Sequence, residues 1–197
     1  MKKYAMVFDA GTGAGRCNLF DMSGRLVSYA YREWEYLKDL SSSNKEAMLF
    51  DAEQFKKILF SLCRKVITQA GISADEIVAV SATSQREGMV WLDRFGKEIY
   101  AAPSVDLRGE EAADILSGKE PFIKEITGLP VSGMFGLARL LWYKKFNEAV
   151  YDRIDTVMMI SDWICYLLCG SKVSEPSVAS SSQLFDIKNG KWSSELL

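Results

Sequence analysis

Hydrophobic and polar positions at the start of the chain predict three consecutive strands. Residues 4–8 form a continuous apolar run that ends at Asp9, which is typical of a strand buried on both faces. Two further runs, 16–20 and 25–34, follow a glycine-rich turn and a second turn that ends at Gly24. Because both connections are short, we expect the three strands to be antiparallel neighbours.

A long amphipathic helix and a fourth strand follow. Asp51 is a good N-cap with Gln54 three residues later, and Gly71 is placed to end the helix. Between them, apolar residues recur at helical spacing, namely Phe55, Ile58, Leu59, Leu62, Val66 and Ile67. The β-rich run at 77–82 predicts another central strand.

The rest of the chain is mostly helical. A hairpin is predicted for 89–92 and 98–102, helices for 137–143 and 160–168, and a final strand for 183–187 before the turn Lys188-Asn-Gly-Lys191. No internal repeat or linker is visible. This order predicts an α/β fold on a mixed sheet, with an antiparallel start and a helical crossover that permits a parallel strand.

Composition narrows the classes of function. The 197 residues are enough for one domain or at most two small ones, and 48% hydrophobic with 25% charged residues is an ordinary globular balance. The net charge of −2 gives no reason to expect a nucleic-acid partner. The chain has no histidine, which excludes a histidine general base, a Ser–His or Cys–His pair and a histidine metal ligand.

The four cysteines indicate a reduced, cytoplasmic protein. Cys17, Cys63, Cys165 and Cys169 lie in apolar runs without a Cys-x-x-Cys pair. Cys165 and Cys169 share a helix face, and we interpret them as core residues rather than a thiol pair. No apolar run approaches the roughly 20 residues needed to cross a bilayer, so no membrane association is expected.

The first candidate for chemistry is the loop Asp9-Ala-Gly-Thr-Gly-Ala-Gly-Arg16. Glycines let backbone N–H groups cradle phosphate oxygens, Thr12 adds a donor, and the Asp9 carboxylate can hold hydrated Mg²⁺. The loop lacks the Gly-Lys-Ser/Thr of a Walker motif, and a strand rather than a helix follows it. A glycine-rich hairpin with Asp as turn former explains the motif equally well.

Three other motifs are weaker when taken alone. Ser84-Gln-Arg-Glu-Gly88 follows a strand end and offers donors and acceptors for sugar hydroxyls, although a solvated loop explains it too. Val105-Asp-Leu-Arg108 is more simply a structural ion pair at a helix start. In Met159-Ile-Ser-Asp-Trp163, Ser161 is explained as an N-cap.

Taken together, the four motifs resemble the FGGY carbohydrate kinases. Asp9-Ala-Gly-Thr12 with Arg16 resembles the family's first phosphate motif, and Gln85-Arg-Glu87 resembles the Gln-Arg-Glu that contacts the polyol in glycerol kinases. Asp106 and Arg108 resemble its Asp-x-Arg element, and Met159-Ile-Ser-Asp-Trp163 has a counterpart further on. These matches, with Arg139-Leu-Leu-Trp142, are most similar to the autoinducer-2 kinase branch.

The resemblance implies a ribonuclease-H-like (actin-like ATPase) half-domain and a kinase that uses ATP and Mg²⁺. It places Asp9, Gly11, Thr12 and Arg16 at the phosphates, with Asp9 near the metal through water. It places Gln85, Arg86 and Glu87 on a sugar or polyol substrate, and extends that set to Asp106 and Met134. Met134 stands where glycerol kinases have a tyrosine, which argues against a small polyol.

Length is the main departure from the family. Family kinases are more than twice as long, and their general base is an Asp in a Gly-Asp-x-x motif that this sequence lacks. We therefore expect residues 1–197 to be an incomplete N-terminal, substrate-side domain without the ATP-side domain, inactive alone and with no catalytic residue of its own. A non-enzymatic sugar-binding or regulatory module is the alternative, and an unrelated actin-like ATPase fragment explains fewer motifs.

Incompleteness has an expected physical consequence. Such a domain would expose apolar surface, with Trp192, Leu196 and Leu197 as candidates. Because large apolar patches rarely stay bare, we expect self-association through this face.

Overall fold

The computed structural model describes residues 3–197, which divide into two compact units. The first unit comprises the described residues up to Glu35 together with Asp51–Gln85 and Ile160–Lys172. The second comprises Tyr36–Phe50, Arg86–Met159 and Val173–Leu197. The chain therefore passes between the units several times, and one passage separates Gln85 from Arg86.

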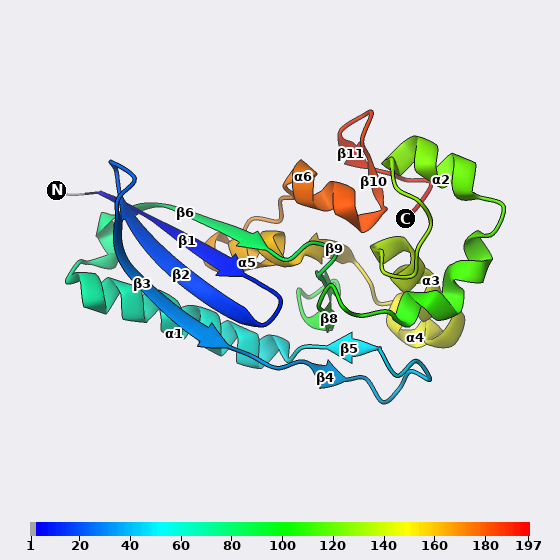
Figure 1. The fold of residues 1–197 in the computed structure, drawn as a ribbon, viewed down its shortest axis with the longest axis horizontal. Coiled ribbons are helices and arrows are strands. Elements are labelled where there is room, and N and C mark those ends of the chain that lie inside the picture. The colour runs from blue at the N-terminus through cyan, green and yellow to red at the C-terminus, as the bar shows by residue number, and fades with distance from the viewer. Residues whose placement is uncertain (1–2) are drawn as a thin grey trace. The chain divides into compact units, whose positions relative to one another are not determined.

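A four-stranded mixed sheet forms the first unit. Its order is β3 (Leu26–Glu33), β2 (Ala14–Asp21), β1 (Tyr4–Ala10) and β6 (Ile77–Ser84) (Figure 1). The first three strands are antiparallel neighbours and β6 is parallel to β1, which confirms the predicted mixed sheet.

Two details of this sheet differ from the sequence-based expectation. β6 was predicted to be central, but it is an edge strand of the sheet that the described residues form. β1 was predicted to be buried on both faces, but its residues alternate between buried and half-buried. In both cases the local apolar run suggested more complete covering than the described residues give the strand.

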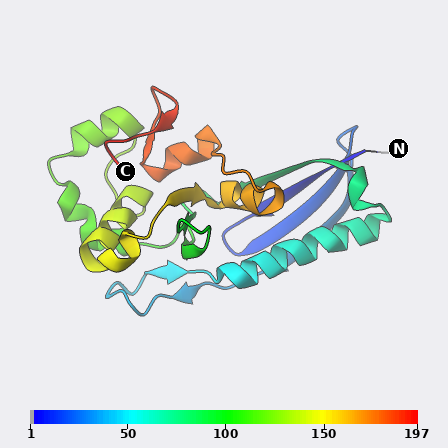
Figure 2. The ribbon, with the colours of Figure 1, turned by 180° about the vertical axis from the view of Figure 1, so that it is seen from behind.

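Two helices cover the buried face of the sheet. Helix α1 (Ala52–Ala70) packs on β2 and β3, α5 (Ile160–Cys169) packs on β6, and the short 3₁₀ turn η1 (Ala74–Glu76) leads into β6 (Figure 2). The predicted helix ends are confirmed. The Asp51 carboxylate accepts a 3.0 Å hydrogen bond from the Gln54 N–H, and Gly71 ends α1 at a φ of 64°.

Phe55 is the centre of the packing between α1, α5 and the sheet. Its ring centroid lies 6.3 Å from that of Phe8, 5.0 Å from Trp34 and 5.2 Å from Trp163. These aromatic contacts connect strand, helix and loop residues that are far apart in the sequence. They account for the amphipathic stripe that the sequence showed on α1.

The second unit is built on a three-stranded antiparallel sheet. Its order is β8 (Glu98–Ala102), β7 (Met89–Leu92) and β9 (Thr156–Met159). The hairpin of β7 and β8 was predicted, whereas β9 was not. The unit also contains two small strand pairs, which are β4 (Leu37–Lys38) with β5 (Met48–Leu49) and β10 (Phe185–Asp186) with β11 (Lys191–Trp192).

Helical segments surround this second sheet. They are η2 (Arg108–Leu116), α2 (Glu120–Thr127), α3 (Gly136–Phe146), α4 (Glu148–Tyr151), α6 (Pro176–Ala179) and η3 (Ser180–Ser182) (Figure 1). None of the helices within residues 3–197 is long and apolar enough to cross a membrane. Trp192 and Leu196 pack against the core of this unit, so their predicted exposure is wrong, while Leu197 is exposed.

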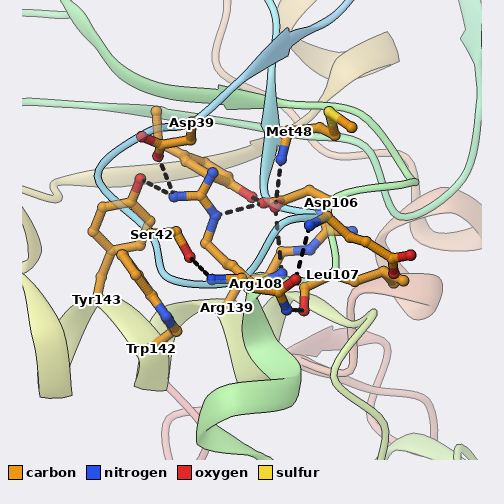
Figure 3. Close-up of polar contacts among 12 residues, drawn as sticks. Asp39, Ser42, Met48, Asp106, Leu107, Arg108, Arg139, Trp142 and Tyr143 are labelled. Carbon is orange, nitrogen blue, oxygen red and sulfur yellow. Dashed lines mark hydrogen bonds and ion pairs between the residues drawn. The ribbon is translucent and has the colours of Figure 1, made fainter.

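A fully buried arginine links three segments of the second unit. The Arg108 Nη1 lies 2.8 Å from an Asp39 carboxylate oxygen and donates to the Tyr143 hydroxyl at 2.8 Å, while its Nε lies 2.8 Å from Asp106 (Figure 3). The rings of Tyr100, Trp142 and Tyr143 lie 5.1–5.2 Å from the guanidinium carbon. Such a buried cation is tolerated only because carboxylates and ring faces replace its water.

Replacing Phe55 by Ala tests the aromatic packing of the first unit. The change leaves a cavity among the three rings, and we expect it to lower the free energy of unfolding by about 3–5 kcal/mol. Phe60→Ala on the exposed side of the same helix is the matched control, with an expected loss of about 1 kcal/mol or less. Urea unfolding followed by tryptophan fluorescence measures both, and equal losses would contradict the packing role.

Replacing Arg108 by Met tests the buried ion-pair cluster. Two carboxylates then lose their cation, and we expect unfolding to become easier by about 3–5 kcal/mol. Adding Asp106→Asn should recover part of the loss, because one uncompensated charge is removed. Arg153→Met is the control, since that arginine is half exposed in its pair with Asp93 and should contribute about 1 kcal/mol or less. If the losses in free energy of unfolding from Arg108→Met and Asp106→Asn simply add in the double variant, the two side chains do not stabilise each other and the prediction is wrong.

Candidate substrate and phosphate sites

The predicted phosphate residues lie at one end of the sheet of the first unit. Asp9 is near the carboxyl end of β1 and pairs in register with Arg16 on β2, so the two side chains share a face. The Arg16 guanidinium carbon lies 5.7 Å from the centre of the Tyr31 ring on the next strand. A carboxylate and an exposed guanidinium are thus brought side by side by strand register.

The loop between β1 and β2 is a tight turn. The Gly11 N–H donates to the Ala14 carbonyl at 2.9 Å, and Thr12 and Gly13 are exposed. Trp34 holds the outside of the turn, because its backbone N–H donates to the Gly13 carbonyl at 3.1 Å and its indole N–H to the Thr12 carbonyl at 3.3 Å. The Thr12 and Gly13 carbonyls and the Gly11 N–H are therefore occupied, which leaves the backbone N–H groups of Thr12 and Gly13 and the Thr12 hydroxyl as donors.

Gln85 belongs with this loop in the structure. Its side-chain amide donates to the Gly11 carbonyl at 3.3 Å, and its backbone N–H donates to the Ala10 carbonyl at 2.8 Å. Gln85 was predicted to contact the substrate, and the structure shows that it also braces the glycine turn. The neighbouring strand end is tied to α5, because the Ser84 hydroxyl accepts from the Ser161 N–H at 3.1 Å.

The second unit contains a cavity of about 470 Å³ lined by three of the predicted substrate residues. Arg86, Glu87 and Met134 all lie on its wall. Its remaining lining residues are Thr127, Gly128, Leu129, Phe135, Ser180, Ser181 and Ile187. A lining that contains both charged groups and apolar side chains suits a small ligand that carries hydroxyl groups on a carbon chain.

Glu87 is the most unusual residue of this cavity. Its φ of 57° is left-handed, a conformation that side chains other than glycine, asparagine and aspartate seldom adopt. Partial burial raises the pKa of its carboxyl group, while the nearby charges of Arg139 and Arg86 act in the opposite direction. A half-desolvated carboxylate is a strong acceptor for ligand hydroxyl groups.

A buried glutamine holds the segment next to the lining residue Leu129. Gln183 has no exposed surface and a φ of 63°, and its amide donates to the Pro130 carbonyl at 2.6 Å. This bond fixes the segment that carries Leu129 and leads to Met134. Gly133 makes a close approach in the same segment, because a Cβ at this position would meet Glu110 atoms at 2.4 Å.

Asp106 does not lie on the cavity wall, and its predicted contact with substrate is corrected. The side chain is fully buried, and its oxygens accept from the Met48 N–H at 3.1 Å, the Tyr100 hydroxyl at 2.5 Å and the Arg108 Nε at 2.8 Å (Figure 3). Asp106 therefore compensates Arg108. The simpler interpretation of the Asp-x-Arg element, as a structural ion pair, describes this structure.

Sequence reasoning missed the residues that hold the cavity together. Arg139 and Ser181 bind backbone atoms of the lining residue Glu87. Gln183 binds the carbonyl of Pro130, which follows the lining residue Leu129. Arg139 did belong to the motif Arg139-Leu-Leu-Trp142, and an arginine within the apolar part of a helix predicts a buried partner without naming it. Within residues 3–197, no group of three or more carboxylate or cysteine side chains is arranged to hold a metal ion.

Proteins with similar sequences include autoinducer-2 kinases. The chain is 34% identical to the autoinducer-2 kinase of Salmonella paratyphi B over 200 residues, and also 34% identical to that of Escherichia coli K12 over 205 residues. These alignments cover 98% and 100% of this chain. The chain spans only 37% of the length of each relative.

Solved structures show the same fold. A xylulose kinase from Rhodospirillum rubrum superposes with a TM-score of 0.85 at 21% identity, covering 98% of this chain and 40% of that one. A gluconate kinase from Lactobacillus acidophilus gives 0.83 at 21% identity, with 100% and 39% covered. The fold is thus the actin-like, ribonuclease-H-like one that the sequence predicted.

The family assignment rests on nearly the entire chain. Residues 4–197 match the N-terminal domain of the FGGY family of carbohydrate kinases. The predicted motifs, the mixed sheet and the relatives agree with this match. The chain belongs to the FGGY carbohydrate kinase family and corresponds to its N-terminal domain.

Proposed function

We propose that this chain is the substrate-side part of a kinase that transfers a phosphoryl group from ATP to a hydroxyl of a sugar or polyol. The observation that carries the proposal is the cavity that brings Arg86, Glu87 and Met134 together. Arg86 donates and Glu87 accepts hydrogen bonds, a combination that suits vicinal hydroxyls. The apolar wall supports a substrate other than a minimal polyol.

The glycine turn fits the terminal phosphates of ATP. The backbone N–H groups of the exposed residues Thr12 and Gly13, with the Arg16 guanidinium, would bind phosphate oxygens. Asp9 supplies a single carboxylate, which suits Mg²⁺ because this ion keeps several waters and takes further ligands from phosphates. When bound, the ion would neutralise charge on the phosphates. Asp9, Gly11, Thr12 and Arg16 remain proposed ligands.

We further propose that the general base and the ATP-side domain come from outside these 197 residues. The sequence holds no Gly-Asp-x-x motif, and the relatives are much longer. A reading frame beyond codon 197 that encodes this motif and a second glycine-rich half would support the idea. The cytoplasm, where ATP and sugars are available, is the proposed location.

A sugar-binding module without catalysis is the second candidate. All residues that line the cavity belong to one unit of this chain, so sugar binding does not require a second domain to build the wall. Micromolar sugar binding by the 197-residue chain would favour this alternative. Millimolar binding, with phosphoryl transfer only after the remaining part is supplied, would favour the kinase.

Replacing Glu87 by Gln tests the sugar site. We expect xylulose or gluconate to shift the amide NMR signals of the cavity residues, and the variant to bind about ten- to a hundredfold more weakly, because a hydrogen bond to a charged group is lost. Glu125→Gln on α2 is the matched control, since this side chain is exposed in its pair with Lys188. Equal affinities for the wild type and the Glu87 variant would exclude this site.

Self-association is tested at the edge strand β6. Val78 and Val80 are 50% and 40% exposed there, and we propose that an apolar edge of this kind pairs with a second strand, such as one from another copy. Sedimentation velocity should show concentration-dependent oligomers that Val78→Lys reduces. Phe95→Lys, at an exposed turn of the other unit, should have no effect. A monomer at high concentration would contradict the proposal.

A further inference from the structure

Glu87 holds a backbone conformation that its own chemistry disfavours. A side chain with a Cβ crowds the carbonyl group when φ is positive, so a glutamate at 57° persists only where neighbours fix it. Non-glycine residues in such conformations cluster at ligand sites.

Arg139 on α3 is the principal neighbour. Its side chain is fully buried, and its Nη1 donates to the Glu87 carbonyl at 2.7 Å while Nη2 donates to the Ser104 carbonyl at 3.1 Å. The planar fork of a guanidinium can hold two carbonyls at fixed positions, which a lysine ammonium does less well. The Arg139 side chain thus connects the residue Glu87, between β6 and β7, to Ser104 in the segment after β8.

Ser181 fixes the other backbone group of the same residue. Its hydroxyl accepts from the Glu87 N–H at 3.4 Å, and its own O–H donates to the Val178 carbonyl at 2.9 Å. Both backbone polar groups of Glu87 are therefore held by side chains, one from α3 and one from η3. With these two bonds in place, the Glu87 side chain lies on the cavity wall.

The charge of Arg139 supports the same geometry. No carboxylate forms an ion pair with Arg139 in the described part of the chain, although this arginine is fully buried. Its charge acts on Glu87 and lowers the pKa of that carboxyl group, against the effect of desolvation. Arg86, on the same wall, acts in the same direction.

We propose that Arg139 is a positioning residue, which locks Glu87 in its left-handed conformation so that the carboxylate faces the cavity. The inference rests on the proposed function in taking this cavity as the sugar site. Arg139 acts on the ligand only through Glu87. It is neither a ligand contact nor a catalytic residue.

The first experiment needs no sugar. The pKa of Glu87 is read from the side-chain carboxyl ¹³C signals of the 197-residue chain, with the Glu87 signal identified by its absence in Glu87→Gln. We expect Arg139→Met to raise the pKa of Glu87 and to shift its amide signal, and Arg139→Lys to shift the amide while keeping the charge. Arg153→Lys is the control. Unchanged Glu87 signals in both Arg139 variants would overturn the proposal, whatever the cavity binds.

The second experiment is a double-variant cycle on sugar binding. With xylulose or gluconate as the probe, Arg139→Lys should weaken binding about tenfold, because a small misplacement of a polar group is costly. In the Glu87→Gln background the same change should have little further effect. Additive effects would show that Arg139 acts on the fold generally and would overturn the proposal.

Two outcomes separate this inference from the proposed function. If the wild-type chain binds no sugar but the Glu87 pKa responds to Arg139, the sugar site fails and the positioning stands. If Arg139→Met does not fold, Arg139→Lys and Ser181→Ala report the same geometry. Ser181→Ala should shift the amide signal of Glu87 in the same way. If neither Ser181→Ala nor Arg139→Lys shifts this signal, the positioning of Glu87 by these residues is contradicted.

Discussion

Buried guanidinium groups must find acceptors inside the protein, and this requirement organises the second unit. Arg108 has no exposed surface, so the energy of removing it from water is offset by two carboxylates, a tyrosine hydroxyl and three aromatic faces. Its partners come from the segment before β5, from the start of η2 and from α3. Satisfying one cation therefore fixes the relative position of three segments that are distant in the sequence.

Arg139 solves the same problem with neutral acceptors. It binds two backbone carbonyls rather than carboxylates, and so its charge is left to act on the cavity wall. The two arginines therefore have different roles. Arg108 stabilises the framework of the unit, with Asp106 committed to it, whereas Arg139 controls the shape and charge of the wall on which Glu87 lies. One buried arginine therefore stabilises the fold of the unit, and the other positions a residue of the cavity.

The two halves of the proposed chemistry are prepared by different physical means. In the first unit, strand register places Asp9 beside Arg16, and a turn held by Trp34 presents donors for phosphate. In the second unit, side-chain bonds to backbone atoms hold residues in disfavoured conformations around an apolar and charged cavity. Membership of the FGGY family is consistent with both, and the chain spans 37% of the length of its autoinducer-2 kinase relatives.

Local sequence signals predicted the elements that are determined by residues close together in the sequence. Helix periodicity, the Asp51 cap and the Gly71 stop all act within a few residues, and α1 has them where the pattern indicated. The weaker local signals failed. The strand β9 is four residues long and pairs with β7 across more than sixty positions, so nothing nearby in the sequence marks it.

The sequence by itself determined the family, the mixed sheet and the residue types available for phosphate and sugar, because these follow from short motifs and periodic burial. Only the tertiary structure decided that Asp106 is enclosed while Arg86, Glu87 and Met134 share a cavity, and that Arg139 reaches the Glu87 carbonyl. The physical reason is that burial and hydrogen-bond partners of polar groups depend on contacts between distant segments, which no local pattern records.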